Sequence, residues 1–118
     1  MGKPLLAECG GMMVCAQRLK TADGLFPMLG LMPARVIMQN RLGGLGMQET
    51  ELETGVLRGH SFHYSRIETD LTPLSRSRNP NGGKEEALYR HGSLLASYVH
   101  FYFRSAPQVI SALLSAHR

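Results

Sequence analysis

The chain has 118 residues, of which 43% are hydrophobic and 19% charged, and this balance is typical of one folded domain rather than of a disordered segment. Its apolar runs are far shorter than the ~20 residues that a transmembrane helix needs, and its first residues do not form a signal peptide. Two cysteines, Cys9 and Cys15, are too few for a disulfide framework or a zinc knuckle. We therefore expect a cytoplasmic protein without a membrane partner.

The formal net charge of +4 raises the question of nucleic acid. The basic residues are scattered along the chain, and only Arg76 and Arg78 form a local pair. A nucleic-acid footprint needs a stripe or a face of basic side chains, ideally interleaved with aromatic ones. We expect no nucleic-acid partner, and a basic nucleic-acid binder is the third hypothesis, behind the two given below.

The first half of the chain predicts short elements separated by turns. A short apolar strand at 5–7 leads through Cys9 into a helix over 11–19, which ends near 21–24. Residues 25–32 are apolar but are interrupted by proline and glycine, so we expect a loop there. Further strands are predicted at 34–39, 45–52 and 56–68, the last with alternating side chains on two used faces.

The second half begins with residues 69–83, which are rich in proline, asparagine and glycine and predict a long mobile loop. Two strands, 86–90 and 94–103, follow across a short turn. A proline opens a predicted helix over 107–117, with Ser105 as its cap. These elements predict one α/β or α+β domain.

The segment around Cys9 carries the strongest chemical signal. A strand that feeds a turn of small residues, here Ala7 and Gly11, into a helix is typical of a nucleophile elbow. At a helix N-terminus, unpaired N–H groups favour thiolate over thiol, and those of Gly10 and Gly11 can donate to a developing oxyanion. The alternative is a buried structural cysteine at a tight turn; Cys15, inside the predicted helix, is a core residue.

Three histidines offer further chemistry. His60 and His63 lie three apart in a predicted strand, so they point to opposite faces and make a poor chelating pair. Since no other ligand cluster completes a site, we expect no bound metal. His100 lies in an aromatic strand far from Cys9 in sequence, as in a Cys/His pair that folding assembles. A hydrogen-bonded core histidine is the alternative for His100.

Three segments, in chain order, carry a family resemblance: Leu6-Ala7-Glu8-Cys9-Gly10-Gly11-Met12-Met13, Arg58-Gly59-His60-Ser61-Phe62-His63-Tyr64-Ser65 and Ala96-Ser97-Tyr98-Val99-His100. They resemble the C-terminal glutaminase domain of the cobyrinic acid a,c-diamide synthases, which belong to the class I (triad) glutamine amidotransferases. Gly46-Met47-Gln48-Glu49 also resembles the family's Gly-Tyr-x-Glu strand. The resemblance runs from Pro4 to Arg104.

The resemblance implies an α/β fold, namely a partial flavodoxin-like class I glutamine amidotransferase domain with a mixed sheet. Residues 1–118 would then be a partial glutaminase domain, with Cys9 at the end of a central parallel strand. Cys9 would attack the side-chain amide of glutamine, giving a glutamyl thioester and ammonia. His100 would increase the nucleophilicity of Cys9 and protonate the leaving ammonia, while Gly10 and Gly11 would help to hold the oxyanion.

The resemblance also implies what lies outside this chain. Ammonia would pass to a synthetase domain or subunit that amidates a corrinoid in cobalamin biosynthesis. ATP and Mg²⁺ are expected only there, and no cofactor is expected in this chain. Because the chain begins at the nucleophile strand, we expect the early strands of the glutaminase domain to be missing, and the isolated chain to be weakly active or inactive.

Two positions depart from the family pattern. Ser61 stands where glutamate is usual, and Tyr102 stands where histidine is usual. Glu8 and Glu49 are therefore the acidic residues to examine as partners that orient His100. The departures favour a second hypothesis, in which the chain is a non-catalytic truncated remnant that acts as a binding or structural module.

The strand at 5–8 is expected to lie at an edge of the sheet, because the strands that precede it in the family are missing. Unpaired N–H and C=O groups of such a strand invite another chain, and only Lys3 and Pro4 blunt this end. We therefore expect a homo-oligomer.

Overall fold

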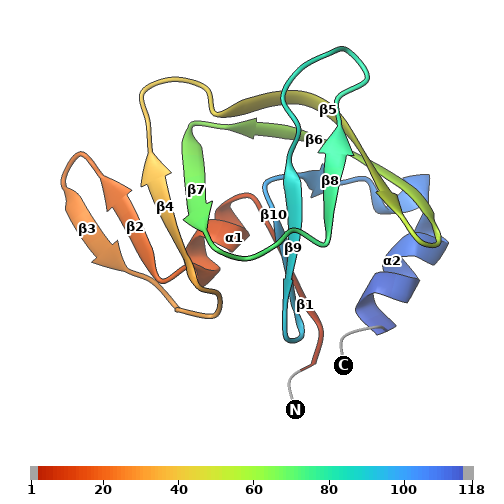
Figure 1. Cartoon of the computed structure of the whole chain (residues 1–118), viewed down its shortest axis with the longest axis horizontal. Coiled ribbons are helices and arrows are strands. Elements are labelled where there is room, and N and C mark those ends of the chain that lie inside the picture. Colours follow the sequence, from red (N-terminus) through yellow and green to blue (C-terminus); the bar gives the residue numbers. More distant parts are fainter. Residues whose placement is uncertain (1–2, 116–118) are drawn as a thin grey trace.

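The structure, a computed structural model, describes residues 3–115 and consists mostly of strands (Figure 1). The strands are β1 (Leu5–Glu8), β2 (Arg18–Thr21), β3 (Gly24–Pro27), β4 (Ala34–Met38), β5 (Gly44–Leu52), β6 (Gly55–His63), β7 (Ser65–Thr69), β8 (Ser75–Arg78), β9 (Ala87–His91), β10 (Leu94–Ser97) and β11 (His100–Phe101). The helices are α1 (Gly10–Cys15), the short 3₁₀ helix η1 (Phe103–Ser105) and α2 (Pro107–Ser115).

These strands form two sheets. The larger has seven strands in the order β1-β10-β9-β8-β5-β6-β11, and the smaller has four in the order β3-β2-β4-β7. β1 pairs in parallel with β10, and β2 pairs in parallel with β4, whereas the other pairings are antiparallel. The predicted α/β class with a mixed sheet is thus confirmed, and β1 lies at an edge of the larger sheet in the described part of the chain.

Two apolar clusters form the core. Helix α1 buries Met12 and Cys15 completely or nearly so, against Val36 of the smaller sheet and Ala96 of the larger one. Helix α2 lies on the side of the larger sheet away from the smaller sheet (Figure 1). Its Val109 belongs to the second apolar cluster. Since α1 packs against both sheets, it fixes the turn that carries Cys9. Within residues 3–115, no helix is long and apolar enough to span a membrane.

In the first half of the chain, three predicted elements have different bounds. The predicted helix over 11–19 is wrong beyond Cys15, because Ala16 is extended and Leu19 pairs with Val36 in the smaller sheet. The predicted loop at 25–32 begins inside β3. The predicted strand at 56–68 is two strands, because the chain leaves the larger sheet after β6, passes Tyr64 and enters the smaller sheet as β7.

The second half also departs from its predictions. The predicted loop at 69–83 contains β8, and the predicted strand at 94–103 is divided into β10 and β11. α2 is confirmed as far as Ser115, and residues 116–117 of the prediction lie outside the described residues. Ser105 is not the predicted cap, because its Oγ donates to the carbonyl of Tyr102 (2.7 Å) and accepts the N–H of Arg58 (3.1 Å).

Candidate active site

Cys9 occupies the turn between β1 and α1. Its φ of 51° and ψ of −110° lie in a region that residues with a side chain rarely adopt, and no other non-glycine residue of the described chain has a positive φ. The turn is held on both sides. The N–H of Cys9 donates to the carbonyl of Ser97 (2.8 Å), and the carbonyl of Cys9 accepts the N–H of Met13 (3.2 Å). Such strain is typical of functional sites with a firm scaffold. The strand, turn and helix of the predicted elbow are present.

The predicted preference for thiolate at Cys9 is wrong. Partial burial raises the pKa of the Cys9 thiol above its ordinary value, and the N–H of Gly10, which lowers that pKa, has a smaller effect. The carboxylates of Glu86 and Glu8 raise the pKa of this thiol further. Because α1 has only six residues, few aligned peptide dipoles oppose these effects. Cys9 therefore needs a base that removes its proton.

Alkylation is expected to modify Cys9 before Cys15, because Cys9 is partly exposed whereas Cys15 is buried in the core, as predicted. The rate at Cys9 should still be rising above the pH at which an ordinary thiol is half ionised, since burial raises its pKa and only the thiolate reacts. Iodoacetamide labelling at several pH values, followed by peptide mapping, measures both. Earlier labelling of Cys15, or a rate that is already level at neutral pH, would contradict this description.

The structure brings the strand of His100 to the end of the sheet that carries Cys9. Glu8, which precedes Cys9, accepts a hydrogen bond through its Oε2 from the backbone N–H of Phe101, which follows His100 (2.9 Å). The N–H of Cys9 is itself bonded to Ser97 at the end of β10, just before the chain turns into β11. The two predicted catalytic residues are thus anchored to one another through their neighbours.

The exposed side chain of His100 lies against a second histidine. His60 faces His100 across the β6–β11 pairing, and their rings are stacked with centroids 5.4 Å apart. Tyr102 Oη lies 3.0 Å from Nδ1 of His60, so this tyrosine contacts His60 and not His100. Tyr102, which stands where the family usually has histidine, is therefore connected to His100 only through the ring of His60 in the described structure.

None of the three other candidates hydrogen-bonds to His100 among residues 3–115. Ser61 is buried, and its Oγ has no hydrogen-bond partner in the described structure. Glu8 uses Oε2 on the backbone of β11. Glu49 pairs with Arg78 at 2.7 Å, and the hydrogen bond from Arg78 lowers the pKa of its carboxyl. A carboxylate that orients His100 is therefore not found in this part of the chain.

A buried polar cluster on the other face of β6 was missed by the sequence analysis. His63 points away from His60, as predicted, and its Nε2 lies 2.8 Å from Oε2 of Glu86. Nδ1 of His63 lies 2.8 Å from the carbonyl of Ser65, and it must donate because a carbonyl only accepts. The contact between Nε2 and Oε2 is therefore a hydrogen bond whose proton lies between these two atoms.

This cluster extends toward the Cys9 turn. The ring of Tyr98 stacks on His63 with centroids 3.6 Å apart and an interplanar angle of 7°. Tyr98 Oη shares a hydrogen bond of 2.8 Å with Ser65 Oγ, which also donates to the sulfur of Met13 in α1 (3.5 Å). Burial raises the pKa of Tyr98 to about 12, so its hydroxyl stays protonated at neutral pH.

Glu86 is held in place by its neighbours in the sheet. Its N–H donates to Ser77 Oγ (2.8 Å), which in turn donates to the buried side chain of Gln48. A Cβ at Gly44 would overlap the carboxylate of Glu86 and the ring of His63, so this position has room only for glycine. The adjacent glycines Gly43 and Gly44 are the one sequence signal for this close approach.

A cavity of about 280 Å³ opens over the cluster. Its lining includes the buried residues His63, Glu86 and Tyr98 and the exposed residues Arg66, Arg76 and Glu85. Small-molecule sites commonly enclose roughly 300 to 1,000 Å³, so this cavity lies just below that range and has room only for a small ligand. No group of three potential metal ligands occurs within residues 3–115.

Comparison with known proteins defines the class. Residues 1–108 match the model of the CobB/CobQ-like glutamine amidotransferase domain, and the chain belongs to this family. The hydrogenobyrinate a,c-diamide synthase of Pseudomonas aeruginosa is 50% identical over 99% of the chain, which corresponds to 27% of that relative. The cobyrinate a,c-diamide synthase of Herminiimonas arsenicoxydans is 48% identical over 95% of the chain and 26% of the relative. The cobyrinate a,c-diamide synthase of Priestia megaterium is 36% identical over 92% of the chain and 26% of the relative.

Proposed function

We propose that this chain is the glutaminase part of a corrinoid a,c-diamide synthase, releasing ammonia from glutamine for ATP-dependent amidation in cobalamin biosynthesis. The observation that carries the proposal is the strained turn at Cys9, tied through Glu8 to the strand of His100 in a chain of the amidotransferase family. The chain spans about a quarter of the length of its curated relatives, so a synthetase part is the proposed partner. ATP and Mg²⁺ belong to that part, and the proposed location is the cytoplasm.

The proposed chemistry begins with proton transfer. His100 takes the proton of the Cys9 thiol, and this transfer is needed because the pKa of that thiol is raised. Sγ then attacks the side-chain carbonyl carbon of glutamine. The C–N bond then breaks, and the nitrogen leaves as ammonia with the proton from His100. Water, deprotonated by His100, hydrolyses the thioester to glutamate and restores the thiol.

The oxyanion formed in this attack needs donors. The N–H groups of Gly10 and Gly11 lie in the first turn of α1, where no carbonyl of the helix can accept them. One such donor commonly contributes a factor of roughly 10² to 10³ in rate.

The diazoketone analogue of L-glutamine (6-diazo-5-oxo-L-norleucine) tests this function without requiring turnover. It is expected to alkylate Cys9 and not Cys15, because recognition of glutamine would deliver the reactive carbon to the nucleophile. Intact-mass measurement and peptide mapping locate the adduct, with Cys9→Ala as the control. If iodoacetamide reaches Cys9 and the diazoketone does not, the glutaminase proposal fails.

That outcome would favour the second candidate function, a non-catalytic remnant that acts as a binding or structural module. The unpartnered Ser61 Oγ and the absence of a carboxylate hydrogen-bonded to His100 within residues 3–115 favour this candidate. It predicts a folded chain whose cysteines react only with general thiol reagents.

A homo-oligomer is proposed from the position of β1. This strand pairs only with β10 in the described structure, and its Leu5 is 46% exposed at the sheet edge. A parallel edge strand with unpaired backbone groups invites pairing with a second copy. Light scattering at micromolar concentration is expected to give at least twice the monomer mass of 13.0 kDa. A monodisperse monomer with a cooperative melt would contradict this proposal.

A further inference from the structure

The orientation of the exposed His100 ring depends on the side chain opposite it. His60 is the partner of His100 in the β6–β11 pairing, and the two rings are stacked with centroids 5.4 Å apart and an interplanar angle of 27°. Favourable pairs of aromatic rings have centroids roughly 4.5 to 7 Å apart, so the two rings are in contact. Within residues 3–115, the ring of His100 has no hydrogen bond or ion pair, and the stack with His60 is therefore what orients it.

The ring of His60 is itself held in place. Tyr102 Oη lies 3.0 Å from Nδ1 of His60, and the backbone N–H of Tyr102 donates to the carbonyl of Arg58 (2.7 Å). The strand β11 can approach β6 this closely because residue 59 is glycine: a Cβ at Gly59 would overlap the carbonyl of His100. Strand pairing and the tyrosine together hold the ring of His60 against that of His100.

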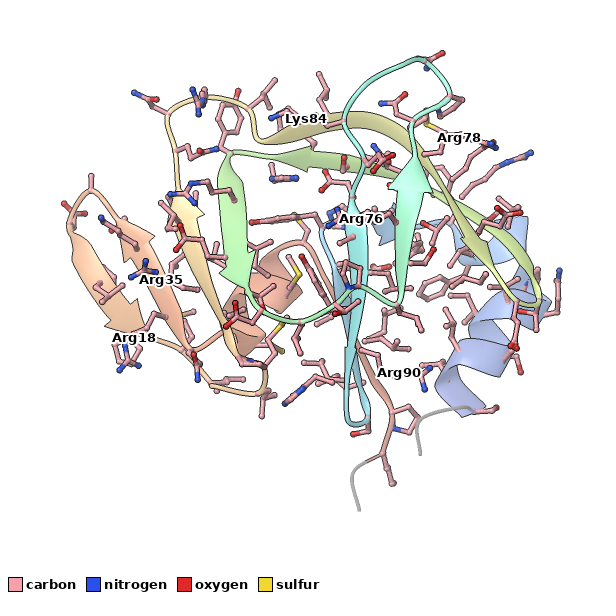
Figure 2. All side chains as sticks on the ribbon, in the orientation of Figure 1. Arg18, Arg35, Arg76, Arg78, Lys84 and Arg90 are labelled. Atoms are coloured by element: carbon pink, nitrogen blue, oxygen red, sulfur yellow. The ribbon has the colours of Figure 1, made fainter. Side chains whose placement is uncertain are left out.

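The two acidic candidates for orienting His100 are engaged elsewhere. Glu49 on β5 pairs at 2.7 Å with Arg78, which lies at the end of β8 (Figure 2). Glu8 accepts the backbone N–H of Phe101 (2.9 Å). In nucleophile–histidine pairs a third group commonly orients the histidine, and a carboxylate often has this role. In this part of the chain the neighbour of His100 is an aromatic ring instead.

We propose that His60 is the positioning residue of His100. Its ring, held by Tyr102, keeps the imidazole of His100 in the orientation in which it accepts the proton of the Cys9 thiol. The inference rests on the proposed glutaminase function, in which His100 is the base. Because the stack and the strand pairing restrict the ring of His100 before glutamine binds, little orientation has to be gained during the reaction, and a displacement of about 1 Å can cost a hundredfold in rate.

Two substitutions of His60 separate its ring from its hydrogen bond. His60→Asn keeps a polar group for Tyr102 Oη but removes the ring, whereas His60→Phe keeps a flat ring without the hydrogen bond. With the chain in excess over glutamine, ammonia release is expected to fall roughly ten- to a hundredfold in His60→Asn and at most about threefold in His60→Phe. Phe62→Ala is the matched control, because Phe62 is an exposed ring of the same strand and contacts Tyr64.

Proton NMR of the histidine rings gives a readout that does not require turnover. The His100 resonances are assigned by their absence from His100→Asn. A stacked ring shifts the resonances of its neighbour, so those of His100 are expected to move in His60→Asn and to stay in place in Phe62→Ala. The resonances of the other histidines report whether each variant is folded.

Three results would overturn the positioning role while leaving the glutaminase proposal intact. They are unchanged His100 resonances in His60→Asn, ammonia release by His60→Asn at the wild-type rate, and equal losses of ammonia release in His60→Asn and His60→Phe. If the wild-type chain releases no ammonia that depends on Cys9, the glutaminase proposal fails and the positioning role fails with it.

Discussion

Glu86→Ala is expected to lower the free energy of unfolding by about 3 to 5 kcal/mol, because it leaves Nε2 of the buried His63 without its hydrogen-bond partner. The His63 and Glu86 side chains are 5% and 8% exposed, so the contact between them is largely shielded from solvent. The cost of the lost Nε2–Oε2 contact adds to that of a void beneath the cavity. Urea denaturation followed by circular dichroism measures the change.

Two matched variants identify the cause of that loss. Glu86→Gln keeps a hydrogen bond, since its amide can donate to Nε2 while His63 Nδ1 still donates to Ser65, so the loss should be clearly smaller. Glu85→Ala, at the exposed neighbouring position, should change the free energy of unfolding by at most about 0.5 kcal/mol. Equal losses for Glu86→Ala and Glu86→Gln would show that the buried pair does not stabilise the fold.

Cys9→Ala is expected to abolish ammonia release from glutamine, and His100→Asn to reduce it by about a hundred- to ten-thousandfold, because the asparagine cannot transfer the proton. A coupled assay for ammonia with the chain in excess measures both rates. Cys15→Ala and His91→Asn are the controls, since Cys15 is a core residue and His91 is exposed at the end of β9. Ammonia release that survives in Cys9→Ala would remove Cys9 from the reaction.

The strands that the sequence predicted well are those with alternating or continuous apolar residues. β4, β5 and the two-faced pattern of β6 fall in this group. The change of sheet at Tyr64 and the short β2 were missed, because each depends on which distant strand is available for pairing. Leu19 fits a helical spacing as well as a strand, and only its pairing with Val36 decides between them.

The candidate site likewise has one feature with a local sequence signal and others without any. The turn at Cys9 has a local signal, since a strand, small residues and a helix follow one another in the chain. The direction of the shift in the pKa of its thiol had no such signal, because burial and the charge of Glu86 come from segments far along the chain. The pairing of Glu86 with His63 likewise joins a loop end to a strand, and neither residue type predicts the other.

The most direct test of the proposed chemistry is to look for the covalent intermediate. The chain is mixed with L-glutamine, quenched in acid, which preserves a thioester, and digested for peptide mapping by mass spectrometry. The proposal predicts a γ-glutamyl adduct on the peptide that contains Cys9, absent from Cys9→Ala and sensitive to hydroxylamine. Ammonia release without an adduct on Cys9 under these conditions, or an adduct on Cys15, would contradict the assignment of Cys9 as the nucleophile.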